Sequence, residues 1–305
     1  MTASVLLAAV TIAFPREGQR FGPLDRCYLI GATDGGETNI VVAGRNVPVY
    51  RTGAWGVLLD VAPGTNSVSA GDVVRTFFVA PRKQLKPGAS KAQEKKYEKL
   101  KYAGDVPKEH PKGRSPGEIT IVVDPGHGGS DTGATSPHGW FEKEANLLLA
   151  REVRSALAAR GYRVVMTRED DSFPELYDRP KVAHANNADA FVSIHHNAPP
   201  HDKDPIKLRY HCVYAWNPLG ERLAKAINVR MAESFGDTLP NNGVMHANFA
   251  VTRNPEIPSC LVETDFVSSP AGEESIWDPL RRKATAEAIA AGIADWCGDL
   301  DGLRR

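Results

Sequence analysis

Residue types that readily bind metal occur at the ends of two apolar runs in this chain. Residues 119–123 are all β-branched, and they lead through Asp-Pro-Gly to His127 on a glycine-rich segment. A later apolar run ends in the pair His195 and His196, and Glu142 opens an amphipathic stretch between the two runs. Two imidazoles and one carboxylate from separate elements can form a three-ligand zinc site with an open fourth position.

Each of these residues also has a simpler interpretation. A histidine on a glycine loop is often just exposed, and a glutamate at a helix start is favoured by the helix dipole. Neighbouring side chains on a strand point to opposite faces, so only one of His195 and His196 can reach a shared site. Taken singly, the residues leave both the metal site and this choice open.

A second carboxylate, Glu263, follows Leu261 and Val262 at the end of another predicted strand. Burying a carboxylate there is costly unless it has a purpose. The carboxyl ends of parallel strands meet at one edge of a sheet, and ligands bind at that edge in open α/β sheets. Glu263 is therefore expected near His127, either as a catalytic acid–base or as a structural ion-pair partner.

The elements that must position these side chains alternate between strand and helix. Apolar residues at helical spacing predict a helix over 143–160, and residues 162–168 then form a strand, which implies a right-handed parallel crossover. Further strands are predicted at 190–195, 208–216 and 259–263, and further helices at 180–187, 221–235 and 280–296. This order predicts an α/β fold, a three-layer sandwich with a mostly parallel sheet.

The first 116 residues follow a different pattern. Residues 1–80 contain short β-type runs separated by Gly, Asp and Asn, which predicts a small all-β, sandwich-like accessory domain. Residues 81–116 are predicted to be a basic, Pro/Lys-rich linker, because eleven Lys and Arg stand against four Asp and Glu between positions 82 and 114. This linker is either a solvated spacer or a segment attracted to anionic polymers or lipid surfaces. The predicted catalytic domain spans residues 117–300.

Composition narrows the class of protein. The formal net charge of zero over 305 residues gives no global attraction to nucleic acid. The four cysteines, Cys27, Cys212, Cys260 and Cys297, have no C-x-x-C spacing, which argues against a thiolate metal site and leaves one disulfide open. The apolar run at 5–14 is too short to span a bilayer and lacks a basic flank, so it is an atypical export signal or a first strand. No transmembrane segment is expected.

Six short motifs occur in the order seen in one known family. They are Asp-Pro-Gly-His-Gly-Gly at 124–129, Asp-Thr-Gly-Ala at 131–134, Glu-Lys at 142–143, Thr-Arg at 167–168, Ser-Ile-His-His-Asn at 193–197 and Leu-Val-Glu-Thr at 261–264. With these motifs the chain resembles the zinc-dependent N-acetylmuramoyl-L-alanine amidases, the cell-wall amidases of bacteria. The resemblance covers roughly residues 117–296.

This resemblance implies hydrolysis of the amide between N-acetylmuramic acid and L-alanine in peptidoglycan, with Zn2+ as the cofactor. It assigns the zinc to His127, Glu142 and His195, the first histidine of Ser-Ile-His, with His196 as the second choice. Glu263 would then help activate the water and pass its proton to the leaving amine.

Four further residues have weaker assignments. Asn197 either orients the substrate or only caps a turn, and Arg253 is a candidate partner for a carboxylate of the peptide stem. Arg179 is expected to form a structural ion pair. Asp124 is expected to hold the His127 loop as a group behind the ligands.

The chain departs from the family pattern at Asp265, which replaces the usual glycine after Val-Glu-Thr and is expected to place a second carboxylate beside the site. Two rival interpretations stand beside the amidase: a zinc peptidase or amidohydrolase with another substrate, and a non-catalytic wall-binding regulator. The intact set of His127, Glu142, His195 and Glu263 argues against the second rival. For the amidase, we expect a location in the cell envelope, periplasmic or secreted, and an envelope regulator as a candidate partner.

Overall fold

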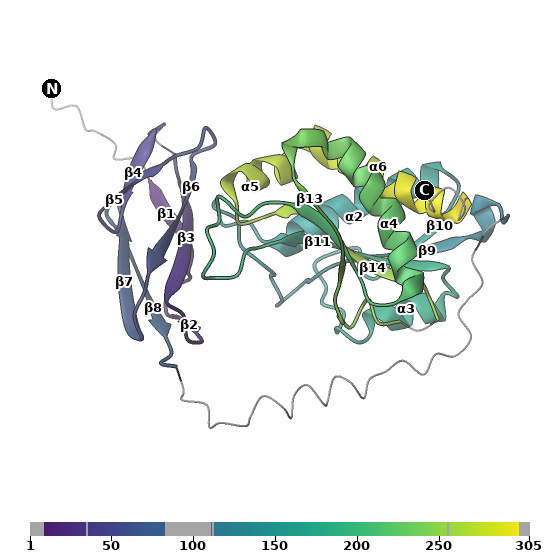
Figure 1. Cartoon of the computed structure of the whole chain (residues 1–305), viewed down its shortest axis with the longest axis horizontal. Coiled ribbons are helices and arrows are strands. Elements are labelled where there is room, and N and C mark those ends of the chain that lie inside the picture. The colour runs from purple at the N-terminus through teal and green to yellow at the C-terminus, as the bar shows by residue number, and fades with distance from the viewer. Residues whose placement is uncertain (1–8, 35, 83–110, 112, 255, 299–305) are drawn as a thin grey trace.

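The computed structural model describes residues 9–34, 36–82, 111, 113–254 and 256–298 (Figure 1). Most of the segment predicted as a basic linker lies outside the described residues, and so does the first part of the apolar run at 5–14. The latter part of that run forms strand β1 (Val10–Phe14).

Residues from 120 onward form a six-stranded sheet. In pairing order its strands are β10 (Arg163–Met166), β9 (Thr120–Pro125), β11 (Ala190–Asn197), β14 (Ser259–Phe266), β12 (His211–Ala215) and β13 (Asn241–His246). Every pairing is parallel except that of β12 with β14, so the sheet is mixed but mostly parallel. The predicted α/β architecture is confirmed. Strand β13 does not follow from the sequence pattern, because its Asn-Asn-Gly start has poor β propensity.

Helices cover both faces of this sheet, as Figure 1 shows. They are α2 (Glu142–Ala159), α3 (Arg179–Ala185), α4 (Pro218–Phe235), α5 (Pro270–Trp277) and α6 (Pro279–Gly298), with short 3-10 turns η1 (Pro116–Glu118) and η2 (Gly236–Thr238). Val123 and Val262 pack with α2, α4 and α6 in one hydrophobic cluster. Val122 and Leu261, their strand neighbours, pack with α3 in another. Alternate residues of each buried strand therefore serve opposite layers.

The strands before residue 80 form two smaller sheets, with orders β1-β3-β6 and β2-β8-β7-β4-β5. Their bounds are β2 (Gln19–Phe21), β3 (Arg26–Thr33), β4 (Asn39–Val42), β5 (Arg45–Pro48), β6 (Ala54–Asp60), β7 (Gly64–Ala70) and β8 (Val73–Val79). Leu29 and Trp55 of the smaller sheet share a hydrophobic cluster with Val42 and Ala70 of the larger one. The two sheets therefore enclose a common core.

The single disulfide that composition leaves open is not formed. Cys27, Cys212, Cys260 and Cys297 are all buried and free, so no disulfide joins them. Among the helices that the structure describes, none combines the length and apolar character needed to cross a membrane.

Candidate metal centre

Three adjacent strands bring the candidate residues to one edge of the sheet. Strand β9 pairs with β11, and β11 pairs with β14, both in parallel, so their carboxyl ends lie together. His195 of β11 lies in register with Glu263 of β14. His127 follows β9 in the left-handed backbone region, with a φ of 60°. A non-glycine residue is uncommon there, and such residues cluster at functional sites.

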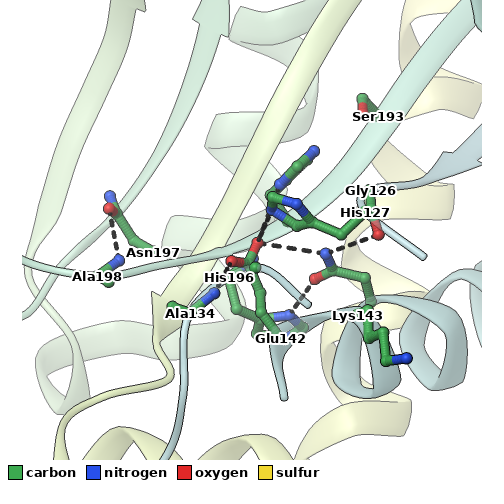
Figure 2. A network of polar contacts seen from close by, with 12 residues as sticks. Gly126, His127, Ala134, Glu142, Lys143, Ser193, His196, Asn197 and Ala198 are labelled. Atoms are coloured by element: carbon green, nitrogen blue, oxygen red, sulfur yellow. Dashed lines mark hydrogen bonds and ion pairs between the residues drawn. The ribbon is translucent and has the colours of Figure 1, made fainter. Parts of the chain in front are cut away.

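The side chains of His127, Glu142 and His195 converge. One potential ligand atom from each lies within 4.8 Å of the other two. Oε1 of Glu142 is 3.2 Å from Nε2 of His127 and 3.0 Å from Nδ1 of His195. Figure 2 shows the polar contacts that meet at the Glu142 carboxylate, at the start of α2. The fold therefore brings together the three residues that the motifs predict to form one site.

Two glycines of the motifs allow this close packing. A Cβ atom on Gly126 would lie 2.1 Å from Nε2 of His195, and one on Gly133 would lie 2.6 Å from Oε2 of Glu142. Real Cβ atoms essentially never come so close to other atoms. The glycines at these two positions thus make room for the converging side chains of His195 and Glu142.

Neighbouring groups orient the three side chains. Nδ1 of His127 lies 2.8 Å from a carboxylate oxygen of Asp131. The backbone N–H of Ala134 donates to Oε2 of Glu142 at 3.0 Å, and the side-chain amide of Asn146 donates to Oε1 at 3.2 Å. A partner on the second ring nitrogen of a ligand histidine fixes its tautomer and ring orientation. Sequence reasoning assigned no role to Asp131 or Asn146, although Asp131 lies four residues after His127.

Arg179 holds the loop of His127 from behind. Its buried guanidinium pairs with Asp124 at 2.9 Å, which confirms the expected structural ion pair. It also donates to the backbone oxygen of His127 at 2.7 Å. Asp124 therefore supports the loop through Arg179, while its other oxygen accepts a hydrogen bond from Ser193 of β11.

Charge interactions at the centre shift the pKa values of its groups. Burial acts to lower the pKa of His127, but hydrogen bonds and charge interactions with Glu142 and Asp131 outweigh it and raise the pKa to about 9. Burial acts to raise the pKa of Glu142, but its contacts with His127 and His195 prevail and hold that pKa well below the usual range. Glu142 is thus an anion between two imidazoles, and this donor set suits a divalent cation.

Glu263 differs from Glu142, because Oε2 of Glu263 is buried and has no hydrogen-bond partner among the described residues. Burial raises the pKa of this carboxyl well above its usual value, and the charge of Glu142 adds to the effect. A buried polar atom without a partner is costly, so its presence at a site calls for an explanation such as a catalytic role or an ion.

A family model described as N-acetylmuramoyl-L-alanine amidase matches residues 121–295, which is more than half of the chain. The chain belongs to this family. The matched range contains all of the converging residues, and the resemblance inferred from the motifs is confirmed.

Several proteins of this amidase family resemble the chain. N-acetylmuramoyl-L-alanine amidase AmiC of Neisseria meningitidis is 33% identical over 226 residues, which cover 60% of this chain and 53% of that protein. AmiA of Escherichia coli is 30% identical over 228 residues, covering 60% of this chain and 78% of that protein. The chain thus spans about half the length of the meningococcal relative.

The fold agrees with solved amidase structures. AmiC2 of Nostoc punctiforme is 35% identical, with a TM-score of 0.55, and the match covers 59% of this chain and 97% of that one. The catalytic domain of CwlV from Bacillus (Paenibacillus) polymyxa is 32% identical, with a TM-score of 0.54, and the match covers 58% and 97%.

In this amidase-family chain a cleft of about 510 Å³ opens beside the candidate metal centre, and His127, His195 and Glu263 line part of its wall. The exposed side chains of Phe173, Leu176 and Phe249 line it as well. The sequence pattern did not identify these aromatic and aliphatic residues, because each stands in an irregular segment without periodic spacing.

The remaining candidates lie elsewhere. His196 is buried on the opposite side of β11, where Nδ1 contacts Oδ1 of Asn146 at 2.8 Å and burial lowers its pKa to about 4. Oδ1 of Asn197 accepts a hydrogen bond from the backbone N–H of Ala198 at 2.8 Å (Figure 2). The Arg253 guanidinium donates to the backbone oxygens of Asn248 and Phe249, both at 3.4 Å. Neither Asn197 nor Arg253 lines the cleft, and their substrate roles stay predictions.

Proposed function

We propose that the protein is a zinc-dependent N-acetylmuramoyl-L-alanine amidase that hydrolyses the amide between N-acetylmuramic acid and L-alanine in peptidoglycan. The observation that carries this proposal is the meeting of His127, Glu142 and His195 at the sheet edge where Glu263 also ends. The activity of family members gives the substrate class.

The three converging residues fit a catalytic zinc site. Two imidazoles and one carboxylate form one of the three-ligand sets that leave a fourth position open. A bound Zn2+ would supply a Lewis acid that polarises the scissile carbonyl and lowers the pKa of water. The unpartnered Oε2 of Glu263 supports this fit, because a carboxylate facing the open position would have a partner only when the site is loaded.

Glu263 is proposed to move the proton. Its carboxylate accepts a proton from the water that attacks the lactyl carbonyl, and it then donates that proton to the amine nitrogen of the leaving L-alanine. Its raised pKa suits both transfers, because a carboxyl group in this setting holds a proton more readily than one in water.

The surrounding residues are proposed to position the reacting groups. Asp131 orients His127, and Asn146 together with the Ala134 backbone fixes the Glu142 carboxylate. The apolar side chains of the cleft would exclude water around the bound substrate, which strengthens electrostatic interactions at the reaction centre.

For the chain as a whole we propose three parts: an accessory β domain at 1–80, a basic linker at 81–116 and the catalytic domain at 117–300. We also propose a location in the cell envelope, periplasmic or secreted, because the proposed substrate is part of the cell wall. A regulatory partner is proposed by analogy, since the CwlD amidase of Clostridioides difficile, 27% identical with a TM-score of 0.54, was solved in complex with the GerS lipoprotein.

The proposal is tested by metal analysis and product analysis of the purified chain. We expect about one zinc per chain, loss of activity after chelation, recovery on adding zinc, and release of stem peptides that begin with L-alanine. The Glu142→Ala variant should lose both zinc and activity, while Glu144→Ala, which changes an exposed glutamate in the same helical turn, should keep both. Digestion without peptides that begin with L-alanine would reject the amidase.

A further inference from the structure

A second cavity, which we call the interdomain chamber, lies on the side of the metal centre that faces the N-terminal strands. Its volume is about 610 Å³. The N-terminal part contributes Arg16, Gln19 and Tyr28, and the α/β part contributes Thr132, Thr135 and His201. The chamber therefore exists only because the two parts of the chain meet.

Specific contacts hold the two parts together around this chamber. The backbone N–H of Tyr28 in β3 donates to the backbone oxygen of His201 at 2.9 Å. The His201 ring stacks on Phe14 with 5.4 Å between ring centroids, and Arg51 pairs with Glu274 of α5. Ring stacking and backbone pairing fix the register of this contact, so the chamber walls have a defined geometry.

The segment Gly133–Ala134 lies between the chamber and the ligand side chains. Gly133 lines the chamber, and its backbone lies so close to the ligands that an added Cβ would be 2.7 Å from Cδ2 of His127. The next residue, Ala134, also lines the chamber and donates its N–H to Glu142. A substrate that extends beyond the metal centre on this side would enter the chamber.

Arg16 supplies the positive charge of the chamber. Its Nη2 donates to the hydroxyl of Thr132 at 2.9 Å and approaches that of Thr135 at 3.5 Å, and its guanidinium lies over the Phe141 ring at 5.3 Å. These contacts hold the guanidinium in place without neutralising it. Among the described residues no carboxylate pairs with Arg16. Glu17, which also lines the chamber, pairs with Arg75 at 3.5 Å and accepts a hydrogen bond from the backbone N–H of Thr76.

The lining differs in character from that of the cleft beside Glu263. Phe173, Leu176 and Phe249 make the cleft largely apolar, whereas the lining of the chamber includes threonine hydroxyls, the Gln19 amide, Arg16 and one carboxylate, that of Glu17. A guanidinium has five N–H donors in a planar fork that matches a carboxylate, and threonine contacts occupy only part of them. The cleft and the interdomain chamber therefore favour different parts of a branched substrate.

We propose that the interdomain chamber is a subsite for a carboxylate of the peptidoglycan peptide, with Arg16 as its anion-binding residue. The proposal rests on the proposed function for the identity of the substrate. It makes the N-terminal β domain part of the substrate site, since Arg16 comes from that domain and Thr132 and Thr135 come from the segment between two ligand residues.

The test measures equilibrium binding of a soluble disaccharide–peptide fragment of peptidoglycan to the full chain, freed of metal so that no turnover occurs. One fragment carries free peptide carboxyl groups, and a second carries the same groups as amides. For the free-acid fragment, Arg16→Ala should weaken binding about tenfold to a hundredfold, the range for losing a charge-assisted hydrogen bond. For the amidated fragment the same variant should change binding less than twofold.

Arg20→Ala is the matched control. Arg20 is also an exposed arginine, and it also lies over an aromatic ring, that of Phe78 at 4.1 Å, but it does not line the chamber. Equal weakening by the Arg16 and Arg20 variants, equal weakening for both fragments, or no binding of the free-acid fragment by the unaltered chain would overturn the subsite.

Kinetics of the zinc-loaded chain separate binding from positioning. With Arg16→Ala, a carboxylate subsite raises KM for the free-acid fragment, and Arg16→Lys restores part of the loss; a fall in kcat with unchanged KM would count against a binding role. Failure of the proposed function looks different: the unaltered chain would bind the free-acid fragment through Arg16 but release no peptide from it.

Discussion

Strand β14 carries two carboxylates, two residues apart, in opposite situations: Glu263 is half-buried and Asp265 is buried. Glu263 has an oxygen without a hydrogen-bond partner among the described residues and lines the cleft beside His127 and His195. Asp265 receives two hydrogen bonds from the Arg209 guanidinium, at 2.7 and 2.6 Å, and is only 3% exposed. Burial raises the pKa of both carboxyls, but at Asp265 the Arg209 pair acts in the opposite direction.

The difference separates a proposed reactive carboxylate from a structural one. A pair such as Asp265 with Arg209 fixes two segments to each other through two parallel charge-assisted hydrogen bonds. Arg209 follows the segment that carries His201, so this pair anchors the segment on which the N-terminal strands dock. Asp265 thus does not line the cleft, although the sequence led us to expect a second carboxylate beside the site.

The largest expected effect comes from Glu263→Gln. This change keeps the size of the side chain but removes its ability to accept and return a proton, so kcat should fall by about 10²- to 10⁴-fold. Zinc content, measured by elemental analysis, should stay unchanged, because Glu263 is not one of the three proposed ligands.

Asp265→Asn is the counterpart on the same strand. It should keep kcat within a few-fold of the unaltered chain, because Asp265 lies outside the cleft. If the two variants lost activity equally, the distinction between the two carboxylates would fail.

A smaller effect is expected on stability. Asp265→Asn removes the negative charge and one of the two acceptor oxygens that face the Arg209 guanidinium. The lost free energy of unfolding should be about 3 kcal/mol, at the low end for a buried pair because Arg209 is 21% exposed. Urea unfolding measures it. Asp60→Asn, which breaks the exposed pair of Asp60 with Arg45, is the control and should cost less than about 1 kcal/mol. Similar losses in both variants would show that burial does not increase the contribution of the Asp265–Arg209 pair to the free energy of unfolding.

The contrast on β14 also shows what sequence can predict. The strand ends, the glycine loop and Glu263 could be predicted from the sequence, because β-branched runs, glycines and helical spacing are local patterns. Asp265 could not be assigned, because its partner Arg209 is 56 residues away and no local pattern specifies that contact.

The candidate site also combines features with a local pattern and features without one. The order of the motifs predicted the convergence of His127, Glu142 and His195, since parallel strands end at one edge. The interdomain chamber depends on Arg16 reaching Thr132 over 116 residues, and tertiary docking of this kind leaves no periodic signal in the chain.

The smallest expected effect concerns His211, which lies near Arg281, a cation that also faces Asp265. His211 is fully buried against Phe235, and neither ring nitrogen has a hydrogen-bond partner among the described residues. Burial lowers its pKa to about 4, with Arg281 acting in the same direction. The folded state therefore keeps this ring neutral at pH values where the unfolded chain binds a proton.

His211→Phe should remove that pH dependence. Between about pH 6.5 and pH 4 the unfolded state of the unaltered chain gains a proton at His211 and the folded state does not, so its stability falls as the pH falls. The variant lacks this loss, and its stability advantage should grow on acidification by at most about 2 kcal/mol at pH 5. Urea unfolding of both proteins at pH 7, 6 and 5 measures the difference, in which the titrations common to both cancel. Parallel stability curves would mean that His211 accepts a proton in the folded state. The region around Arg281, which acts on both His211 and Asp265, would then admit water.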